Sequence, residues 1–93
     1  MSETIEKSAA PSLKQNKPNP FRTATIIEYF VPEDKEVAKI KLYNFVGQEV
    51  KSYDVTGRGY IQVNLSNFEN GMYHYTLVVD GKIVDTKKMV LIK

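Results

Sequence analysis

The chain of 93 residues contains no cysteine and no tryptophan, and His74 is its only histidine. Without cysteine, neither a disulfide framework nor a thiolate metal site can form. A single imidazole with no matching ligand spacing around it gives no support for a zinc site. No apolar run approaches the roughly 20 residues that a membrane-spanning helix needs. The sequence therefore predicts a small domain that depends on its hydrophobic core alone, with no metal and no cofactor.

Signatures of catalysis are missing as well. The chain has no G-x-S-x-G motif and no phosphate-binding glycine loop. Its carboxylates fall at expected turns or on expected outer faces, without the apolar surroundings that acid–base catalysis needs. The formal net charge of +2 is modest, whereas nucleic-acid-binding domains are usually much more basic. We therefore expect a protein that is not an enzyme and does not bind nucleic acid.

The chain divides into a short tail and one domain. Residues 1–14 are polar and lack periodicity, which predicts a flexible linker, and they have no signal-peptide pattern, so an exported form is expected to belong to a longer precursor. Residues 15–93 are the predicted domain. It opens on residues 15–21, where Pro18 and Pro20 exclude a helix and favour a rigid, extended chain, and Phe21 is expected to anchor in the core.

Alternation of apolar and polar residues dominates the rest of the chain. Ala38, Ile40 and Leu42, for example, are expected to face inward between outward lysines. Asp80 and Gly81 suit a two-residue type I′ turn between two strands. Residues 56–59 are expected to be a loop, and residues 66–70 a short polar link. The expected strands are 25–31, 38–43, 49–55, 60–65, 72–79, 82–85 and 87–92. This pattern predicts an all-β fold, an immunoglobulin-like antiparallel β-sandwich of about seven strands.

Four sequence blocks occur in a specific order along residues 13–93. They are L-K-Q-N-K-P-N-P-F at 13–21, I-K-L-Y-N-F-V-G-Q-E-V at 40–50, L-S-N-F-E-N-G-M-Y-H-Y-T-L at 65–77 and K-K-M-V-L-I-K at 87–93. Each block alone is a weak signal, but all four in order are specific. Together they resemble the C-terminal sorting domain, type A, that type IX secretion cargo carries in Bacteroidetes-type bacteria.

The resemblance implies a sorting and translocation signal for a covalently attached N-terminal passenger. Such a domain is read by the outer-membrane translocon after the precursor has reached the periplasm. A sortase then commonly removes it at an upstream linker, here expected within residues 7–14. The passenger is released or anchored to an anionic lipopolysaccharide, so the protein is expected to be secreted or located at the cell surface.

The last strand is the predicted recognition element. One interpretation is that residues 89–92 are simply covered on both faces within the sandwich. The other is that the strand offers its free edge for β-augmentation, with its lysines attracted to an acidic receptor. Gly71 and Tyr73, which belong to the resemblance, also have structural interpretations as a turn glycine and a buried tyrosine. The expected partner-binding residues are Lys87, Lys88, Met89, Val90, Leu91, Ile92, Lys93, Gly71 and Tyr73.

Two further roles stay open for a fold of this kind. Phe30, Tyr43, Tyr53 and Tyr60 could stack on sugar rings, which would make the chain a carbohydrate- or surface-binding module of a secreted enzyme or adhesin, although packing under loops is the simpler interpretation. A purely structural spacer is the third role. An exposed edge strand would also permit a homodimer.

Overall fold

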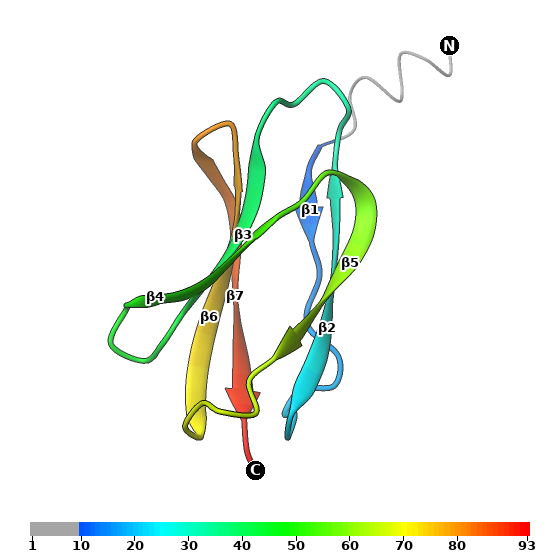
Figure 1. The fold of residues 1–93 in the computed structure, drawn as a ribbon. Coiled ribbons are helices and arrows are strands. Elements are labelled where there is room, and N and C mark those ends of the chain that lie inside the picture. Colours follow the sequence, from blue (N-terminus) through cyan, green and yellow to red (C-terminus); the bar gives the residue numbers. More distant parts are fainter. Residues whose placement is uncertain (1–9) are drawn as a thin grey trace.

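The structure, a computed structural model, describes residues 10–93 as two antiparallel β-sheets packed face to face (Figure 1). The first sheet has the order β1-β2-β5, with β1 at Ser12–Leu13, β2 at Ala24–Val31 and β5 at Gly57–Asn64. The second has the order β4-β3-β6-β7, with β4 at Glu49–Asp54, β3 at Ala38–Tyr43, β6 at Gly71–Val79 and β7 at Lys82–Leu91. This part of the chain contains no helix, and the predicted immunoglobulin-like sandwich is confirmed.

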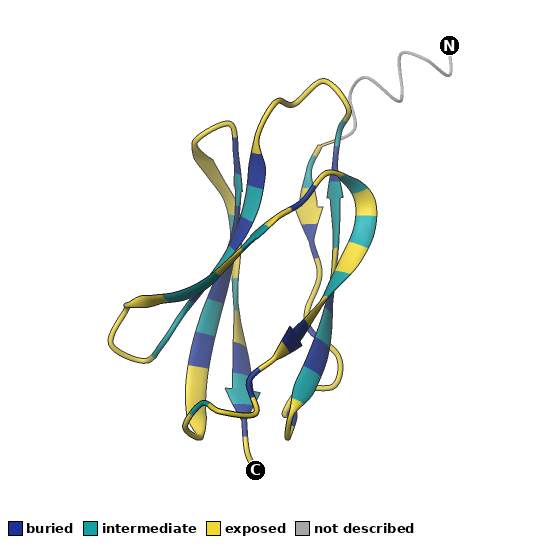
Figure 2. Ribbon diagram, viewed as in Figure 1, coloured by how far each residue is buried: buried dark blue, intermediate teal, exposed yellow. Residues whose placement is uncertain are grey.

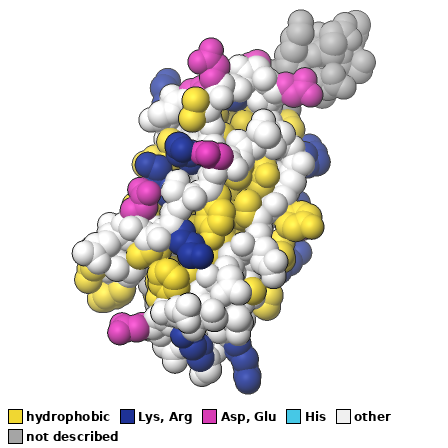
Figure 3. Space-filling model, in the orientation of Figure 1, with side chains coloured by type: hydrophobic (Ala, Val, Ile, Leu, Met, Phe, Trp, Pro, Cys, Tyr) yellow, Lys and Arg dark blue, Asp and Glu magenta, His cyan; other side chains and the backbone are white. Residues whose placement is uncertain are grey.

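The core forms where the inward faces of the two sheets meet (Figure 2). Strand β3 buries Ala38, Ile40 and Leu42, as its alternation predicts. Hydrophobic side chains remain visible between the sheets in the space-filling view, along the side of β4 and β5 (Figure 3). Burying one large aliphatic or aromatic side chain stabilises the fold by about 1.5–3 kcal/mol, which makes this core the main source of stability. The buried hydrophobic residues are Leu13, Phe21, Ile27, Val31, Ala38, Ile40, Leu42, Val55, Val63, Leu65, Tyr73, Tyr75, Leu77, Val79, Met89 and Leu91.

Strand β5 begins earlier than the sequence pattern predicts. Gly57 and Gly59 pair with Val31 and Tyr29 of β2, so the prediction of a loop over residues 56–59 is wrong for residues 57–59. Glycine is a common loop signal, but here Gly59 makes room inside a strand. A Cβ atom at Gly59 would lie 3.1 Å from the hydroxyl oxygen of Tyr29, which is closer than side chains normally pack.

The last hairpin contains one long strand rather than two short ones. Asp80 and Gly81 have φ angles of 49° and 83°, as a type I′ turn requires, so the predicted turn is confirmed. The expected strands 82–85 and 87–92 are continuous as β7. A register shift between Leu77 and Val78 marks a β-bulge or irregularity in this hairpin.

The sandwich also starts before the predicted boundary at residue 15. Ser12 and Leu13 pair with Phe30 and Tyr29 of β2, and Leu13 is buried. Residues 12–14 therefore belong to the sheet and not to a flexible tail. Residues 1–9, which make up most of the predicted tail and include residues 7–9 of the expected cleavage region, lie outside the described residues.

Candidate functional site

The last residues of the chain have two different environments. Met89 and Leu91 are fully buried in the core, whereas Lys88, Val90 and Ile92 alternate with them on the outer face of the sheet. Ile92 is 52% exposed. Although the run is apolar at consecutive positions, only alternate side chains are available to a partner. Of the predicted recognition residues, the structure therefore assigns Met89 and Leu91 to the core.

Strand β7 lies at the edge of its sheet, but its outer edge is covered near the carboxyl end. The N–H of Phe21 donates to the carbonyl of Val90, and the N–H of Ile92 donates to the carbonyl of Phe21, both at 2.9 Å. Phe21 thus forms a parallel bridge with Leu91. We call residues 14–22, which run along this edge, the capping segment.

Two polar side chains of the capping segment continue the same edge. Asn19 Oδ1 accepts a 2.9 Å hydrogen bond from the N–H of Val90, and Gln15 Nε2 donates to the carbonyl of Lys88 at 2.7 Å. The hypothesis that the final strand offers a free edge is therefore wrong for residues 88–92. The physical reason is that side chains and one backbone bridge supply the partners that a neighbouring strand would otherwise provide.

The capping segment is held to the core by a buried polar network. Asn16 is buried, and its N–H donates to the hydroxyl of Tyr75 at 2.8 Å, while that hydroxyl donates to the carbonyl of Lys14 at 2.8 Å. Asn16 Nδ2 donates to Thr25 Oγ1 at 3.0 Å. Burial raises the pKa of Tyr75 to about 12, partly offset by the hydrogen bond from Asn16. Tyr75 was not among the predicted site residues, since on a core strand it looks like any other buried aromatic.

The capping segment bends at residues 18–20. The Lys17–Pro18 and Asn19–Pro20 peptide bonds are both cis, and the segment turns between its two contacts with β-structure at Lys17 and Phe21. The extended path predicted for residues 15–21 is therefore interrupted. Phe21 itself is buried, as expected.

Gly71 and Tyr73 shape the loop before β6. The Tyr73 hydroxyl donates to the carbonyl of Glu69 at 2.6 Å, which is the geometry of a tyrosine corner. Desolvation raises the pKa of this phenol, and the nearby carboxylate of Glu69 adds to the effect. Gly71 has a φ of 148°, a conformation that side chains disfavour, although a Cβ there would meet open space. Both residues therefore have a structural role.

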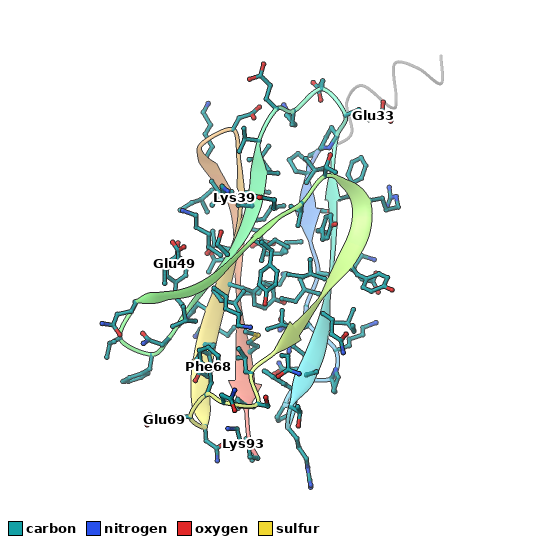
Figure 4. The ribbon with its side chains drawn as sticks, in the orientation of Figure 1. Glu33, Lys39, Glu49, Phe68, Glu69 and Lys93 are labelled. Carbon is teal, nitrogen blue, oxygen red and sulfur yellow. The ribbon has the colours of Figure 1, made fainter. Side chains whose placement is uncertain are left out.

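The same loop holds the last residue of the chain. Lys93 donates from its backbone N–H to Asn70 Oδ1 at 3.0 Å, and its Nζ donates to the carbonyl of Ser66 at 2.7 Å. Figure 4 shows Phe68, Glu69 and Lys93 together at this end of the sandwich. The motif residues Gly71 and Tyr73 are thus connected to the C-terminal lysine through the loop that they shape.

An apolar groove of about 500 Å³ opens beside this loop. Its exposed side includes Phe45 and Val46 at the tip of the β3–β4 turn, which are 80% and 71% exposed. Gly71 and Tyr73 also line it. The groove places exposed apolar side chains at the same end of the domain as the C-terminus.

The aromatic residues considered for sugar binding do not form one platform. Tyr60 is 65% exposed on β5, whereas Tyr53 on β4, in the other sheet, packs against the core. Tyr43 is half-buried on β3, and the ring of Phe30 lies 4.5 Å from the guanidinium carbon of Arg58. The four residues therefore do not form a single stacking surface.

Neither a metal site nor a membrane-spanning helix is found in residues 10–93. No group of three or more His, Cys, Asp or Glu side chains there could hold a metal ion. No helix in that region is long and apolar enough to cross a membrane. His74, half-buried on β6, is paired in register with Lys88 and Tyr43.

Comparison with known protein families gives one clear result. The family described as the secretion system C-terminal sorting domain matches residues 18–93, from the second half of the capping segment to the last residue. Searches of curated proteins and of solved structures gave no match. The matched range covers both strands of the last hairpin, the tyrosine corner and the Phe21 bridge. The chain therefore belongs to the family of type IX secretion system C-terminal sorting domains.

Proposed function

We infer that this domain belongs to a secreted or cell-surface protein that is exported through the outer membrane with the help of the type IX machinery. We propose that this chain acts as the signal itself, without catalysis, and that the translocon reads the outward side chains of the last strand. The residues we assign to this contact are Lys88, Val90, Ile92 and Lys93. Met89 and Leu91 hold the strand in place from the core side.

One observation carries this proposal. Both backbone polar groups of Val90 that point away from β6 are already bonded to the capping segment. A partner that added a strand at this edge would have to displace the capping segment, including the buried Phe21. Recognition through exposed side chains requires no such displacement, so it is the route the geometry favours.

We also propose that a sortase cuts the precursor before the sheet begins. Within the expected cleavage region, Ser12, Leu13 and Lys14 are hydrogen-bonded or paired with β2. Cleavage at residues 7–11 would leave the sandwich intact, whereas cleavage after Leu13 would cut inside it. Anchoring of the passenger at the cell surface after this cut is part of the same proposal.

We also propose that the domain self-associates through β5, which lies at the edge of its sheet. Leu65 N–H donates to the carbonyl of Thr23, so even-numbered residues of β5 turn their backbone groups away from β2. Its outward side chains include no carboxylate and one cation, Arg58, whereas β4 carries Glu49 and Asp54. Charges protect an edge from pairing. Sedimentation at increasing concentration, with Gln62→Lys as the blocked variant, tests this.

The export proposal is tested with a soluble reporter fused before residue 10 and expressed in a host with a type IX system. Deletion of residues 88–93 should abolish export. Ile92→Ser should strongly reduce it, whereas Ile83→Ser should not. Ile92 directly follows β7 and is 52% exposed, and Ile83 lies near the start of β7 and is 72% exposed. The control therefore removes an exposed apolar side chain of the same kind from the opposite end of the same strand. Normal export after the deletion would refute the proposal.

A further inference from the structure

Two segments that lack acidic residues lie side by side in the fold. No Asp or Glu occurs between Ala10 and Ile27, nor between Thr86 and Lys93. Hydrogen bonds from Gln15 and Phe21 of the first segment to β7 join the two. Their exposed cations form what we call the basic margin, consisting of Lys14, Lys17, Arg22, Lys88 and Lys93.

Backbone contacts place four of these cations along the edge of β7, whereas Lys17 lies where the capping segment pairs with Ile26 of β2. Because Phe21 forms a parallel bridge with Leu91, Arg22 follows the chain beside Ile92 and Lys93. Gln15 contacts Lys88, so Lys14 and Lys88 flank the other end of the same edge. Figure 3 shows Lys and Arg side chains at the end of the sandwich where the chain terminates. Lys14, Arg22, Lys88 and Lys93 therefore follow the capped edge of β7, and Lys17 adds a cation on the side of β2.

None of the cations of the basic margin forms an ion pair within residues 10–93, although Glu28 lies opposite Lys14 where the chain pairs with β2. Each ion pair found there uses a lysine elsewhere, in the pairs Lys35–Asp34, Lys39–Asp54, Lys41–Glu49 and Lys87–Asp85. In the basic margin, by contrast, Lys93 Nζ donates to the carbonyl of Ser66. Unpaired cations on an exposed edge create a positive field that attracts an acidic partner and raises its rate of association.

We propose that the basic margin binds an acidic protein segment of the export machinery, with Lys14, Lys17 and Arg22 of the capping segment as contact residues. This inference rests on the proposed function and extends it to a part of the chain that precedes the last strand by some 70 residues. Lys14 and Lys17 lie outside the range that the family match covers.

A protein partner fits this surface better than a lipid surface. The margin is a row of cations along one edge, and the apolar side chains beside it are Val90, which is half-buried, and Ile92. Stable membrane binding requires a broad apolar face in addition to basic residues. A carboxylate-bearing segment needs only to follow the row, because flexible lysine side chains can adjust to it.

The test uses the triple variant Lys14→Gln, Lys17→Gln, Arg22→Gln in the reporter fusion. The matched control is Lys35→Gln, Lys39→Gln, Lys82→Gln, which removes the same charge from the rest of the domain. The loss of three exposed cationic contacts predicts about tenfold slower export for the margin variant. Binding of the full chain to a glutamate homopeptide should weaken to a similar extent, and should weaken further as salt is added.

Each outcome is decisive. Reduced export and weaker peptide binding for the margin triple alone support the inference. If both triple variants lose export equally, the effect is one of net charge and the inference fails. If the margin variant is exported normally, the inference is also overturned. Tight binding to phosphatidylglycerol vesicles without binding to the glutamate peptide would also overturn it. Deletion of residues 88–93 should still abolish export in those cases, which separates this inference from the proposed function.

Discussion

Asn19 and Val90, 71 positions apart in the chain, are joined by a 2.9 Å hydrogen bond from the Val90 N–H to Asn19 Oδ1. A side-chain amide thus occupies the position that a carbonyl of an adjacent strand would take. The carbonyl of Val90 accepts a second hydrogen bond, from the backbone N–H of Phe21. The edge of the last strand is therefore closed by the segment through which the chain enters the domain.

Asn19→Ala should weaken this closure. The N–H of Val90 then loses its partner, and since it lies at a partly exposed edge we expect a loss of about 1 kcal/mol in the free energy of unfolding. Urea denaturation measures the change. The control is Asn67→Ala, since Asn67 is exposed in the loop before β6 and makes no side-chain hydrogen bond to residues 10–93. Equal stability of the two variants would contradict the assigned role of Asn19.

Tyr75→Phe should lower the free energy of unfolding more than Asn19→Ala does, because the Tyr75 hydroxyl forms hydrogen bonds with two backbone groups. It accepts from the Asn16 N–H and donates to the Lys14 carbonyl, both at 2.8 Å, and Tyr75 is fully buried. Leaving such groups unpaired costs about 1–3 kcal/mol. Tyr73→Phe, which removes a single hydrogen bond to Glu69, is the matched control and should cost about 1 kcal/mol. If the two substitutions cost the same, Tyr75 does not hold the capping segment.

Stability should fall at high pH. Burial raises the pKa of Tyr75 to about 12 from the usual 10.0, so the folded state keeps a proton that the unfolded chain releases. This contribution is fully present below pH 10 and is lost as the pH rises towards about 12. One proton corresponds to a slope of at most about 1.4 kcal/mol per pH unit. Urea midpoints recorded across this range measure it.

The Tyr75→Phe variant isolates this contribution from the rest of the pH dependence. Its stability should depend less steeply on pH between 10 and 12 than that of the parent chain. Burial also raises the pKa of Tyr53 and Tyr73, so some decline should remain. Parallel pH profiles for parent and variant would show that Tyr75 does not contribute.

Much of the fold could be predicted because its signals are local. The alternation of Ala38, Ile40 and Leu42 and the Asp80–Gly81 turn identify their elements without any long-range information. Gly59 was misleading because its role depends on Tyr29 in another strand. A glycine that makes room for a distant side chain looks the same in sequence as a glycine in a loop.

The candidate site was harder to predict for two physical reasons. Residues 89–92 are all apolar, so no periodicity shows which of them face inward, and only the register with β6 places Met89 and Leu91 in the core. The cap on the outer edge uses the side chains of Gln15 and Asn19. Such side-chain contacts to a distant backbone leave no pattern in the sequence.

The adjacent residues Lys88 and Met89 should separate recognition from folding. Met89 is fully buried, so Met89→Ala leaves a cavity and should lower the free energy of unfolding by about 2–5 kcal/mol. Lys88 is exposed, and Lys88→Ala should change stability by no more than about 0.5 kcal/mol. Thermal denaturation of the two variants measures this difference directly.

Export of the reporter fusion at two growth temperatures then distinguishes the two causes of failure. The Met89→Ala defect arises from unfolding, so it should be relieved at the lower temperature, where the domain is again folded. The Lys88→Ala defect arises from a missing contact with the translocon, so lowering the temperature should not restore export. Recovery of Lys88→Ala together with Met89→Ala would indicate that residue 88 supports the fold, and the proposal that its side chain is recognised would then fail.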